Sequence, residues 1–441
     1  MKSPIFNYIE KKIPHTMKKT AYLITLLIAL FSFVALAKPT GSYKLVVEGF
    51  DWGAGVNKVI LSLSDTTSIV NGMEYSVFAS RKSTAGAIAD DQSSGKRDVI
   101  GAYVSDENGN RVKTGKNITL VLMVGPQLPI SSPIQYFRSK GNVWVDYQLT
   151  IVHAKSQQVW DTNTGKIMPL IDQFDLTGKY KFNDQLTMSY ASFSPKIKKD
   201  KAPLIIWLHG GGEGGFDPTI PLLGNKAANY AAEPIQSIFE GAYVLSPQCP
   251  GAWMHNAQKI STHGKENDVY NEGLMALIKD YVKSNPNIDP TRIYVGGCSN
   301  GGYMALKLIL LYPDYFAAGY ISALAYRSEY ISDTDIQKIK QVPIWFVHSK
   351  DDATTIPDLT VVPVYKRLQA AGAKNVHFTY YDHVNDITNF YGGKGFQYNG
   401  HWSWVYLHEN LPKTDFDSSL VKVNGKPVSI MEWMATQKKG K

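Results

Sequence analysis

The sequence has little cysteine, little charge and no long apolar run beyond residue 36. Only 2 of its 441 residues are cysteine, which excludes a disulfide-framed small protein and a four-cysteine zinc site. Charged residues make up 19% and aromatic residues 12%, and this composition excludes a disordered chain. Without a later apolar run of about 20 residues, we expect no stable membrane insertion of the mature chain. At roughly 150 residues per domain, the length predicts two or three domains.

A largely apolar run near the N-terminus, residues 21–36, follows Lys18 and Lys19. It ends in Ala35-Leu36-Ala37, the small-x-small pattern that signal peptidase accepts. Because the run is shorter than the roughly 20 residues that span a bilayer, it predicts a signal peptide at residues 1–37 rather than a membrane anchor, with Met17 as an alternative start. We therefore expect a secreted or periplasmic protein.

The net charge of +8 comes partly from this same segment. Residues 1–37 hold five lysines and one glutamate, so their removal leaves a net charge of +4. A charge this small over the remaining chain argues against an acidic partner, and we expect no binding to nucleic acid.

Residues 40–153 have a period-two pattern that is typical of half-buried strands. It is clearest where Val145, Tyr147, Leu149 and Ile151 alternate with Asp146, Gln148 and Thr150. Turn signals such as Asn71-Gly72 and Asn108-Gly109 separate the runs. About seven short strands over roughly 110 residues predict an immunoglobulin-like β-sandwich, without the disulfide that joins its sheets in antibodies.

Residues 186–441 have a different pattern, in which short apolar runs alternate with amphipathic helices. The runs expected to be buried strands are residues 204–208, 243–245, 293–295, 317–321, 342–347 and 376–380. This alternation predicts a doubly wound, mostly parallel α/β domain. Residues 186–194 alternate as an antiparallel edge strand does, and residues 154–185 are expected to form a linker or bridging segment.

The most informative motif is Gly297-Cys298-Ser299-Asn300-Gly301, which directly follows an expected strand and precedes an expected helix. This is the context of the G-x-S-x-G nucleophile elbow. The turn is so tight that side chains two positions before and after the serine would collide, so glycine is required there. The motif predicts Ser299 as a nucleophile, with the helix N-terminus favouring a developing oxyanion.

A glycine-rich segment, His209 to Gly215, directly follows the expected strand 204–208. It lacks the Lys-Ser/Thr pair of a phosphate-binding loop and does not match G-x-G-x-x-G. We expect it to form an oxyanion hole, in which backbone N–H groups of Gly211 and Gly212 act together with that of Asn300. His209 is expected to brace this loop rather than to act as the base.

An acid and a histidine should follow the serine in this fold, in that order. The expected strand 342–347 leads into Asp351 and Asp352, of which Asp352 is the first candidate and Asp351 the second. Three histidines follow the last expected strand: His383, His401 and His408. His401 is favoured as the base because it follows a loop and precedes a terminal helix, and His383 is the second candidate.

Four motifs resemble one known family: WLHGGGEGG at 207–215, SPQCP at 246–250, GCSNGGYM at 297–304 and NGHWSW at 399–404. They are similar to those of secreted bacterial α/β-hydrolase esterases with an N-terminal immunoglobulin-like domain, which include prolyl-oligopeptidase-type and feruloyl-esterase-like serine hydrolases. The resemblance spans nearly all of the mature chain and implies the fold and the Ser-His-Asp triad, but not the substrate. One difference is that the segment DDATTIP, residues 351–357, is one residue longer before its proline than in the family.

These residues lead us to expect a serine carboxylesterase that forms an acyl-enzyme and needs no metal or organic cofactor. Its substrates are expected to be acyl or phenolic esters, with plant polysaccharide esters among the candidates, and Trp253, Tyr303 and Trp402 are candidates for substrate contact. A serine peptidase of prolyl-oligopeptidase type is one alternative, although about 110 residues cannot form its propeller. A non-catalytic carbohydrate- or surface-binding protein is another. No sequence pattern indicates the oligomeric state.

The two cysteines lie on expected loops at one edge of the sheet, where the active site is also expected. Cys249 follows the strand 243–245, and Cys298 lies inside the elbow. Because loops that follow neighbouring strands meet at this edge and no other cysteine is available in an exported chain, we expect a disulfide between Cys249 and Cys298; two buried thiols are the alternative.

Overall fold

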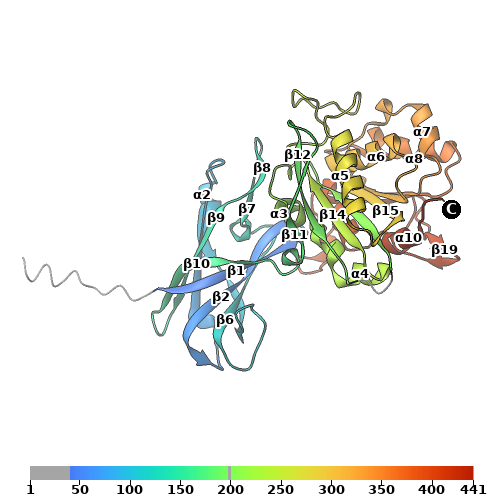
Figure 1. The fold of residues 1–441 in the computed structure, drawn as a ribbon. Helices are drawn as coiled ribbons and strands as arrows, with labels where there is room; N and C mark the ends of the chain where they lie inside the picture. Colours follow the sequence, from blue (N-terminus) through green and yellow to red (C-terminus); the bar gives the residue numbers. More distant parts are fainter. Residues whose placement is uncertain (1–39, 197–199, 441) are drawn as a thin grey trace, which may run out of the picture.

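The computed structural model describes residues 40–196 and 200–440. The signal peptide predicted at residues 1–37 lies outside this part of the chain. The described residues form two sheet-based domains that lie side by side (Figure 1). Across these residues, no helix is both long and apolar enough to cross a membrane.

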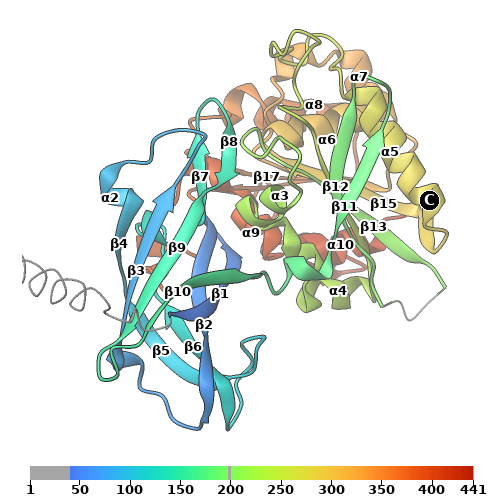
Figure 2. The ribbon, with the colours of Figure 1, turned by 60° about the vertical axis from the view of Figure 1, so that its left-hand side comes forward.

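The N-terminal domain is built on one hydrogen-bonded sheet that folds over its own core (Figure 2). Its strands, in spatial order, are β4 (Ser94–Arg97), β3 (Tyr75–Lys82), β9 (Asp146–His153), β10 (Val159–Ile167), β1 (Gly41–Phe50), β2 (Gly53–Thr67), β6 (Gly115–Leu122) and β5 (Val99–Ser105). Alternate residues of β3 and β9, such as Val77 and Leu149, pack into the same cluster as Leu61 of β2 and Leu120 of β6. The apolar residues of the period-two pattern therefore face a shared core, as expected for a sandwich.

A short hairpin projects from this domain toward the second one. It consists of β7 (Ile134–Phe137) and β8 (Gly141–Trp144), which pair with each other in a separate sheet. In both ribbon views the hairpin lies between the two domains (Figures 1 and 2). A short helix, α2 (Asp90–Ser93), lies between β3 and β4 in the chain.

Residues 154–185, expected to link the domains, are instead divided between the two sheets. β10 lies between β9 and β1 and runs parallel to β1. β11 (Asp175–Lys181) is the edge strand of the second sheet, so β12 (Thr187–Phe193) is antiparallel as expected but is not at the edge. The sequence did not reveal β10 because Trp160 is its only buried residue, which leaves no apolar alternation.

The C-terminal domain is a doubly wound α/β domain. Its sheet contains, in spatial order, β11, β12, β14 (Tyr243–Gln248), β13 (Ala202–Leu208), β15 (Ile288–Cys298), β16 (Ala318–Ser322), β17 (Ile344–Ser349) and β18 (Val376–Tyr381). The six strands from β14 to β18 are parallel. A two-stranded hairpin of β19 (Lys422–Val423) and β20 (Lys426–Pro427) follows near the C-terminus.

Helices cover both faces of this sheet, as the continuous apolar strands require. Ile205 and Trp207 of β13 pack on one face, and Leu204, Ile206 and Leu208 pack on the other. The first face is covered by α3 (Thr219–Gly224), α4 (Glu233–Phe239), α9 (Trp404–His408) and α10 (Ile430–Thr436). The second is covered by α5 (Asn271–Ser284), α6 (Asn300–Leu311), α7 (Asp333–Ile339) and α8 (Val361–Ala370). The first face is continuous with the core of the N-terminal sandwich.

The expected disulfide between Cys249 and Cys298 is wrong, because both are buried free cysteines. Cys249 follows β14 and Cys298 ends β15, and β13 lies between these two strands. Strands that flank a third lie about 9.5 Å apart. A disulfide requires Cα atoms within about 7 Å. The alternative of two buried thiols is the observed state.

We therefore expect two free thiols per chain when the denatured, non-reduced protein is titrated with a thiol reagent. Adding reductant should leave the melting temperature unchanged, because no covalent link constrains the unfolded chain. A count of zero thiols would contradict the strand order described above.

Candidate active site

Ser299 lies on a strained turn between β15 and α6. It precedes the first residue of α6 and has φ of 53° and ψ of −118°, a conformation that L-residues rarely adopt. A Cβ atom at Gly301 would lie 2.0 Å from the Leu208 carbonyl oxygen, and one at Gly297 would lie 2.5 Å from the backbone of Gly301. Both glycines are thus required by close backbone contacts, as the elbow motif predicts.

A hydrogen-bonded chain joins Ser299, His401 and Asp352. The distance between Ser299 Oγ and His401 Nε2 is 3.0 Å, and that between His401 Nδ1 and Asp352 Oδ2 is 2.8 Å. His401 lies on a short 3-10 helix, Gly400–Trp402, and Asp352 lies on the loop after β17. The structure therefore brings the three first candidates together in the order needed for proton transfer.

The Asp352 carboxylate is buried and surrounded by donors. Its Oδ1 accepts hydrogen bonds from the backbone N–H groups of Thr354 and Thr355, and its Oδ2 accepts one from Thr355 Oγ1 at 2.7 Å. His348 Nε2 lies 2.9 Å from Oδ2 as well. Burial alone would raise the pKa of Asp352, but the hydrogen bonds from His348 and His401 outweigh it and hold that pKa well below its usual range. Asp352 is therefore ionised at neutral pH.

His348 was missed by the sequence analysis, although it lies four residues before Asp352. It is the penultimate residue of β17, and its side chain is fully buried. Burial lowers its pKa, so its ring is neutral and supports Asp352 as a hydrogen-bond donor rather than as a cation. A histidine at the end of the strand that precedes the acid was the available signal.

The second candidates, Asp351 and His383, form a separate pair. Asp351 Oδ2 lies 2.9 Å from His383 Nδ1, and Asp351 Oδ1 also accepts a hydrogen bond from Ser349. The side chains of His383 and Asp351 are 45% and 34% exposed, whereas that of Asp352 is fully buried. Of the pairs formed by these candidates, only that of His401 and Asp352 contacts Ser299.

The glycine-rich loop after β13 lies close to Ser299. A Cβ atom added at Gly211 would lie 3.8 Å from that of Asn300, so the loop and the start of α6 approach each other. Asn300 is the first residue of α6, where backbone N–H groups have no partner within the helix. Gly211, Gly212 and Asn300 are therefore placed around one edge of the site.

His209 braces this loop as expected. Its Nδ1 lies 2.6 Å from the Gly210 carbonyl oxygen, and its Nε2 accepts a hydrogen bond from the backbone N–H of Cys249 at 3.2 Å. Complete burial lowers the pKa of His209 to about 4. The ring is therefore neutral, with its proton on Nδ1, and it does not contact Ser299 Oγ.

A cavity of about 910 Å³ opens onto these residues. Both domains line it: Trp52, Arg81 and Tyr136 come from the sandwich, and Ser299, His401 and Trp402 from the α/β domain. Of the three aromatic residues expected to contact substrate, Trp402 alone lines this cavity.

Trp253 and Tyr303 are fully buried instead, and their expected contact with substrate is wrong. Trp253 Nε1 donates to the His209 carbonyl, and its backbone N–H donates to Asn300 Oδ1 at 2.6 Å. Tyr303 donates to Asp268 Oδ2 at 2.8 Å. Trp253 thus supports the site from behind, through His209 and Asn300, whereas Tyr303 belongs to the core on the α6 side of the sheet.

Two stretches of the chain match known protein families. Residues 42–166 match a family described as esterase Ig-like N-terminal domain, and residues 192–389 match the phospholipase/carboxylesterase family. The chain is a hydrolase that combines an esterase Ig-like N-terminal domain with a phospholipase/carboxylesterase domain. Its α/β-hydrolase fold and its immunoglobulin-like N-terminal domain are those expected from the sequence.

Two curated esterases are similar to parts of this hydrolase. It is 31% identical to feruloyl esterase B of Neurospora crassa over 128 residues, which are 29% of this chain and 41% of that enzyme. It is 32% identical to acetylxylan esterase A of Emericella nidulans over 101 residues, 22% of this chain and 32% of that enzyme. The matched part is thus less than half of either relative.

A solved thermostable esterase shares the fold of both domains. It covers 90% of this chain and 99% of its own, with a TM-score of 0.70 at 22% identity.

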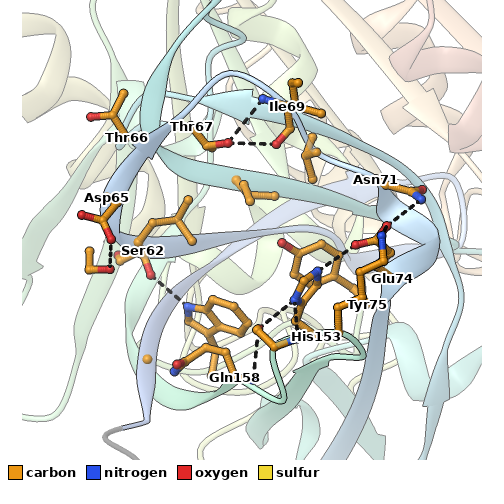
Figure 3. Close-up of a pocket in the computed structure, with 18 residues that line it drawn as sticks. Ser62, Asp65, Thr66, Thr67, Ile69, Asn71, Glu74, Tyr75, His153 and Gln158 are labelled. Atoms are coloured by element: carbon orange, nitrogen blue, oxygen red, sulfur yellow. Dashed lines mark hydrogen bonds and ion pairs between the residues drawn. The ribbon is translucent and has the colours of Figure 1, made fainter.

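A second cavity of about 770 Å³ lies in the Ig-like domain of the hydrolase (Figure 3). None of the candidate catalytic residues lines it. Several of its polar groups pair with each other: His153 Nε2 lies 3.0 Å from Glu74 Oε2, and Trp160 Nε1 donates to the Ser62 carbonyl. These polar groups of the cavity lining are therefore hydrogen-bonded to each other, and the pairs stabilise the turns at this end of the sandwich.

Glu213 is a buried acid within the glycine-rich loop, and the sequence analysis assigned it no role. Burial raises its pKa to about 7, although Asn225 and Asn142 act against this. Its Oε1 lies 3.2 Å from Asn142 Nδ2, on the β7–β8 hairpin of the other domain.

The raised pKa of Glu213 predicts a loss of stability as pH rises. Between its ordinary pKa of 4.5 and about 7, the native state keeps a proton that the unfolded chain has released. We expect the wild-type free energy of unfolding to fall between pH 5 and 8 by on the order of 3 kcal/mol more than that of Glu213→Gln. Urea unfolding at several pH values measures the difference, with the exposed Glu107→Gln as control. Parallel pH profiles for wild type and Glu213→Gln would contradict this assignment.

Proposed function

We propose that this hydrolase is a serine carboxylesterase in which Ser299 is the nucleophile, His401 the base and Asp352 the acid of a catalytic triad. The observation that carries the proposal is the 3.0 Å contact of Ser299 Oγ with His401 Nε2 on a strained nucleophile elbow. The buried Asp352 lies behind the same imidazole at 2.8 Å.

The reaction begins when Ser299 Oγ attacks an ester carbonyl carbon and gives its proton to His401 Nε2. Asp352, held ionised by its donors, orients the imidazole through Nδ1–H and stabilises the imidazolium. His401 then protonates the leaving alcohol, and the acyl group remains on Ser299. Water attacks this acyl-enzyme by the same route, with His401 as base, and releases the carboxylic acid.

The negative charge that develops on the carbonyl oxygen requires donors fixed in advance. Backbone N–H groups of Gly211, Gly212 and Asn300 fill this role. They lie where the glycine-rich loop meets the N-terminus of α6, whose dipole favours the same charge. No metal or cofactor has a part in these steps.

We infer acyl or phenolic esters as substrates, with esters of plant polysaccharide as the leading candidates. The activities for which the two curated relatives are named, those of feruloyl esterase B and acetylxylan esterase A, support this class. A cavity of about 910 Å³ with aromatic and polar walls has room for a phenolic acyl group or a sugar. With the signal sequence expected at residues 1–37, such a protein acts outside the cytoplasm.

The two alternatives differ from this function in measurable ways. A serine peptidase would cleave a peptide anilide faster than an ester, and a non-catalytic binding protein would cleave neither. Hydrolysis rates with p-nitrophenyl esters of increasing chain length, feruloyl and acetyl-sugar esters and a peptide anilide separate the three.

Replacing the nucleophile should abolish activity without unfolding the protein. We expect Ser299→Ala to lower kcat by about four orders of magnitude or more. The melting temperature should stay within a few degrees of the wild-type value, since the hydroxyl contributes little to packing. Residual activity near one tenth of wild type would remove Ser299 from its role.

The first and second candidates for base and acid provide a matched test of the other triad members. We expect losses of several orders of magnitude for His401→Ala and Asp352→Ala, and at most modest losses for His383→Ala and Asp351→Ala. The kcat for p-nitrophenyl acetate measures all four variants beside their melting temperatures. An inactive His383→Ala with an active His401→Ala would reverse the assignment.

A further inference from the structure

The glycine-rich loop has few side chains that could fix its conformation. Hydrogen bonds to its backbone carbonyls fix it instead. His209 Nδ1 donates to the Gly210 carbonyl at 2.6 Å, and Gln248 Nε2 donates to the Glu213 carbonyl at 2.8 Å. Both donors belong to the α/β domain. The Gly212 carbonyl lies between them in sequence and is held differently.

The donor to the Gly212 carbonyl comes from the Ig-like domain. The backbone N–H of Asn142, in β8, donates to it at 2.7 Å. The side-chain amide of the same residue lies 3.2 Å from Glu213 Oε1. Asn142 therefore contacts two successive residues of the loop, one through its main chain and one through its side chain.

The hairpin is shaped for this approach. Gly141 has φ of 74°, and a Cβ atom there would lie 2.5 Å from the Gly212 carbonyl oxygen. Glycine is required at this position both by the turn and by the contact. The two strands of the hairpin are short, so its position must be fixed from outside.

Anchors on both domains hold the hairpin in place. Arg81 donates to the Ile134 carbonyl at 3.2 Å and to Gln135 Oε1 at 2.9 Å, at the start of β7. Trp144, at the end of β8, donates through Nε1 to Thr219 Oγ1 of α3 at 2.9 Å. The sandwich thereby positions the hairpin tip against the glycine-rich loop, and the contact of Trp144 with Thr219 fixes the hairpin to the α/β domain.

We propose that Asn142 is a positioning residue for the oxyanion hole, and that the β7–β8 hairpin is the means by which the Ig-like domain contributes to catalysis. This inference rests on the proposed function. The hairpin holds the Gly212–Glu213 peptide, so that the N–H groups of Gly211 and Gly212 stay directed at the reacting carbonyl before charge develops. Donors that must first reorganise stabilise a transition state less. Loss of the hairpin contact therefore lowers kcat and leaves the ground-state binding of substrate nearly unchanged.

The test uses Gly141→Ala and Asn142→Ala in the full chain. Gly141→Ala places a methyl group against the Gly212 carbonyl, and Asn142→Ala removes the donor to Glu213. For p-nitrophenyl acetate we expect kcat to fall about 10-fold to 100-fold in Gly141→Ala and about 10-fold in Asn142→Ala, with KM within about threefold. Affinity for phenylboronic acid, which forms a tetrahedral adduct with the serine, should weaken by a similar factor to kcat.

Gly425→Ala is the matched control. Gly425 has φ of 78° in the turn between β19 and β20, and nothing lies within 4 Å of an added Cβ. It carries the same backbone strain as Gly141→Ala without the contact, so its kcat should equal that of wild type. If Gly141→Ala fails to fold, Asn142→Ala, which adds no atom, decides alone.

Wild-type kcat in the folded hairpin variants would overturn the proposal, as would an equal loss in Gly425→Ala. A raised KM with unchanged kcat and unchanged boronate affinity would also overturn it, because the hairpin would then act on substrate binding. Failure of the proposed function would look different: wild type and Gly425→Ala would both leave every ester intact.

Discussion

The strained backbone of Ser299 is the constraint on which the rest of the site depends. A non-glycine residue at φ of 53° and ψ of −118° costs on the order of 1–3 kcal/mol. Packing on every side maintains it: Ser299 N–H donates to the Ser322 carbonyl of β16 at 3.1 Å, and Gly301 lies directly against the Leu208 carbonyl of β13. The turn is thus fixed by the two strands that flank β15. The sheet holds the turn in place, and the strained conformation directs the Ser299 hydroxyl into the cavity.

The same sheet accounts for a buried charge that would otherwise be costly. Asp352 has a fully buried side chain, and an isolated carboxylate in such a place would take up a proton. Two backbone N–H groups, one hydroxyl and two imidazoles satisfy its oxygens. Because those donors are already in place, the carboxylate needs no rearrangement when His401 becomes positively charged. Asp351, one residue earlier and partly exposed, lacks this enclosure and pairs with His383 instead.

Local patterns predicted the elbow, the loop and the order of the acid and histidine because each depends on a short stretch and on one chain order. Strand order is non-local, and this is why the expected Cys249–Cys298 disulfide was wrong: the sequence does not state that β13 lies between β14 and β15. For Trp253 and Tyr303, the sequence does not distinguish an aromatic residue that lines a cavity from one that is buried in the core, where both lie. His348, Glu213 and Asn142 act through burial and contacts between distant segments, which no periodicity records. The sequence did not predict β10 because its residues are mostly exposed and polar and show no apolar alternation.

The way the domains join explains how a distant segment can take part in the site. One apolar cluster runs from the sandwich core, through α3, onto one face of the α/β sheet, with Leu61, Leu222 and Trp207 among its members. Domains joined by a large apolar interface do not move freely against each other. A hairpin fixed to the sandwich therefore keeps its position relative to Ser299, which a hairpin on a flexible linker would not. The interface that stabilises the two-domain fold is then also what allows the sandwich to supply part of the cavity wall and a hydrogen bond to the Gly212 carbonyl.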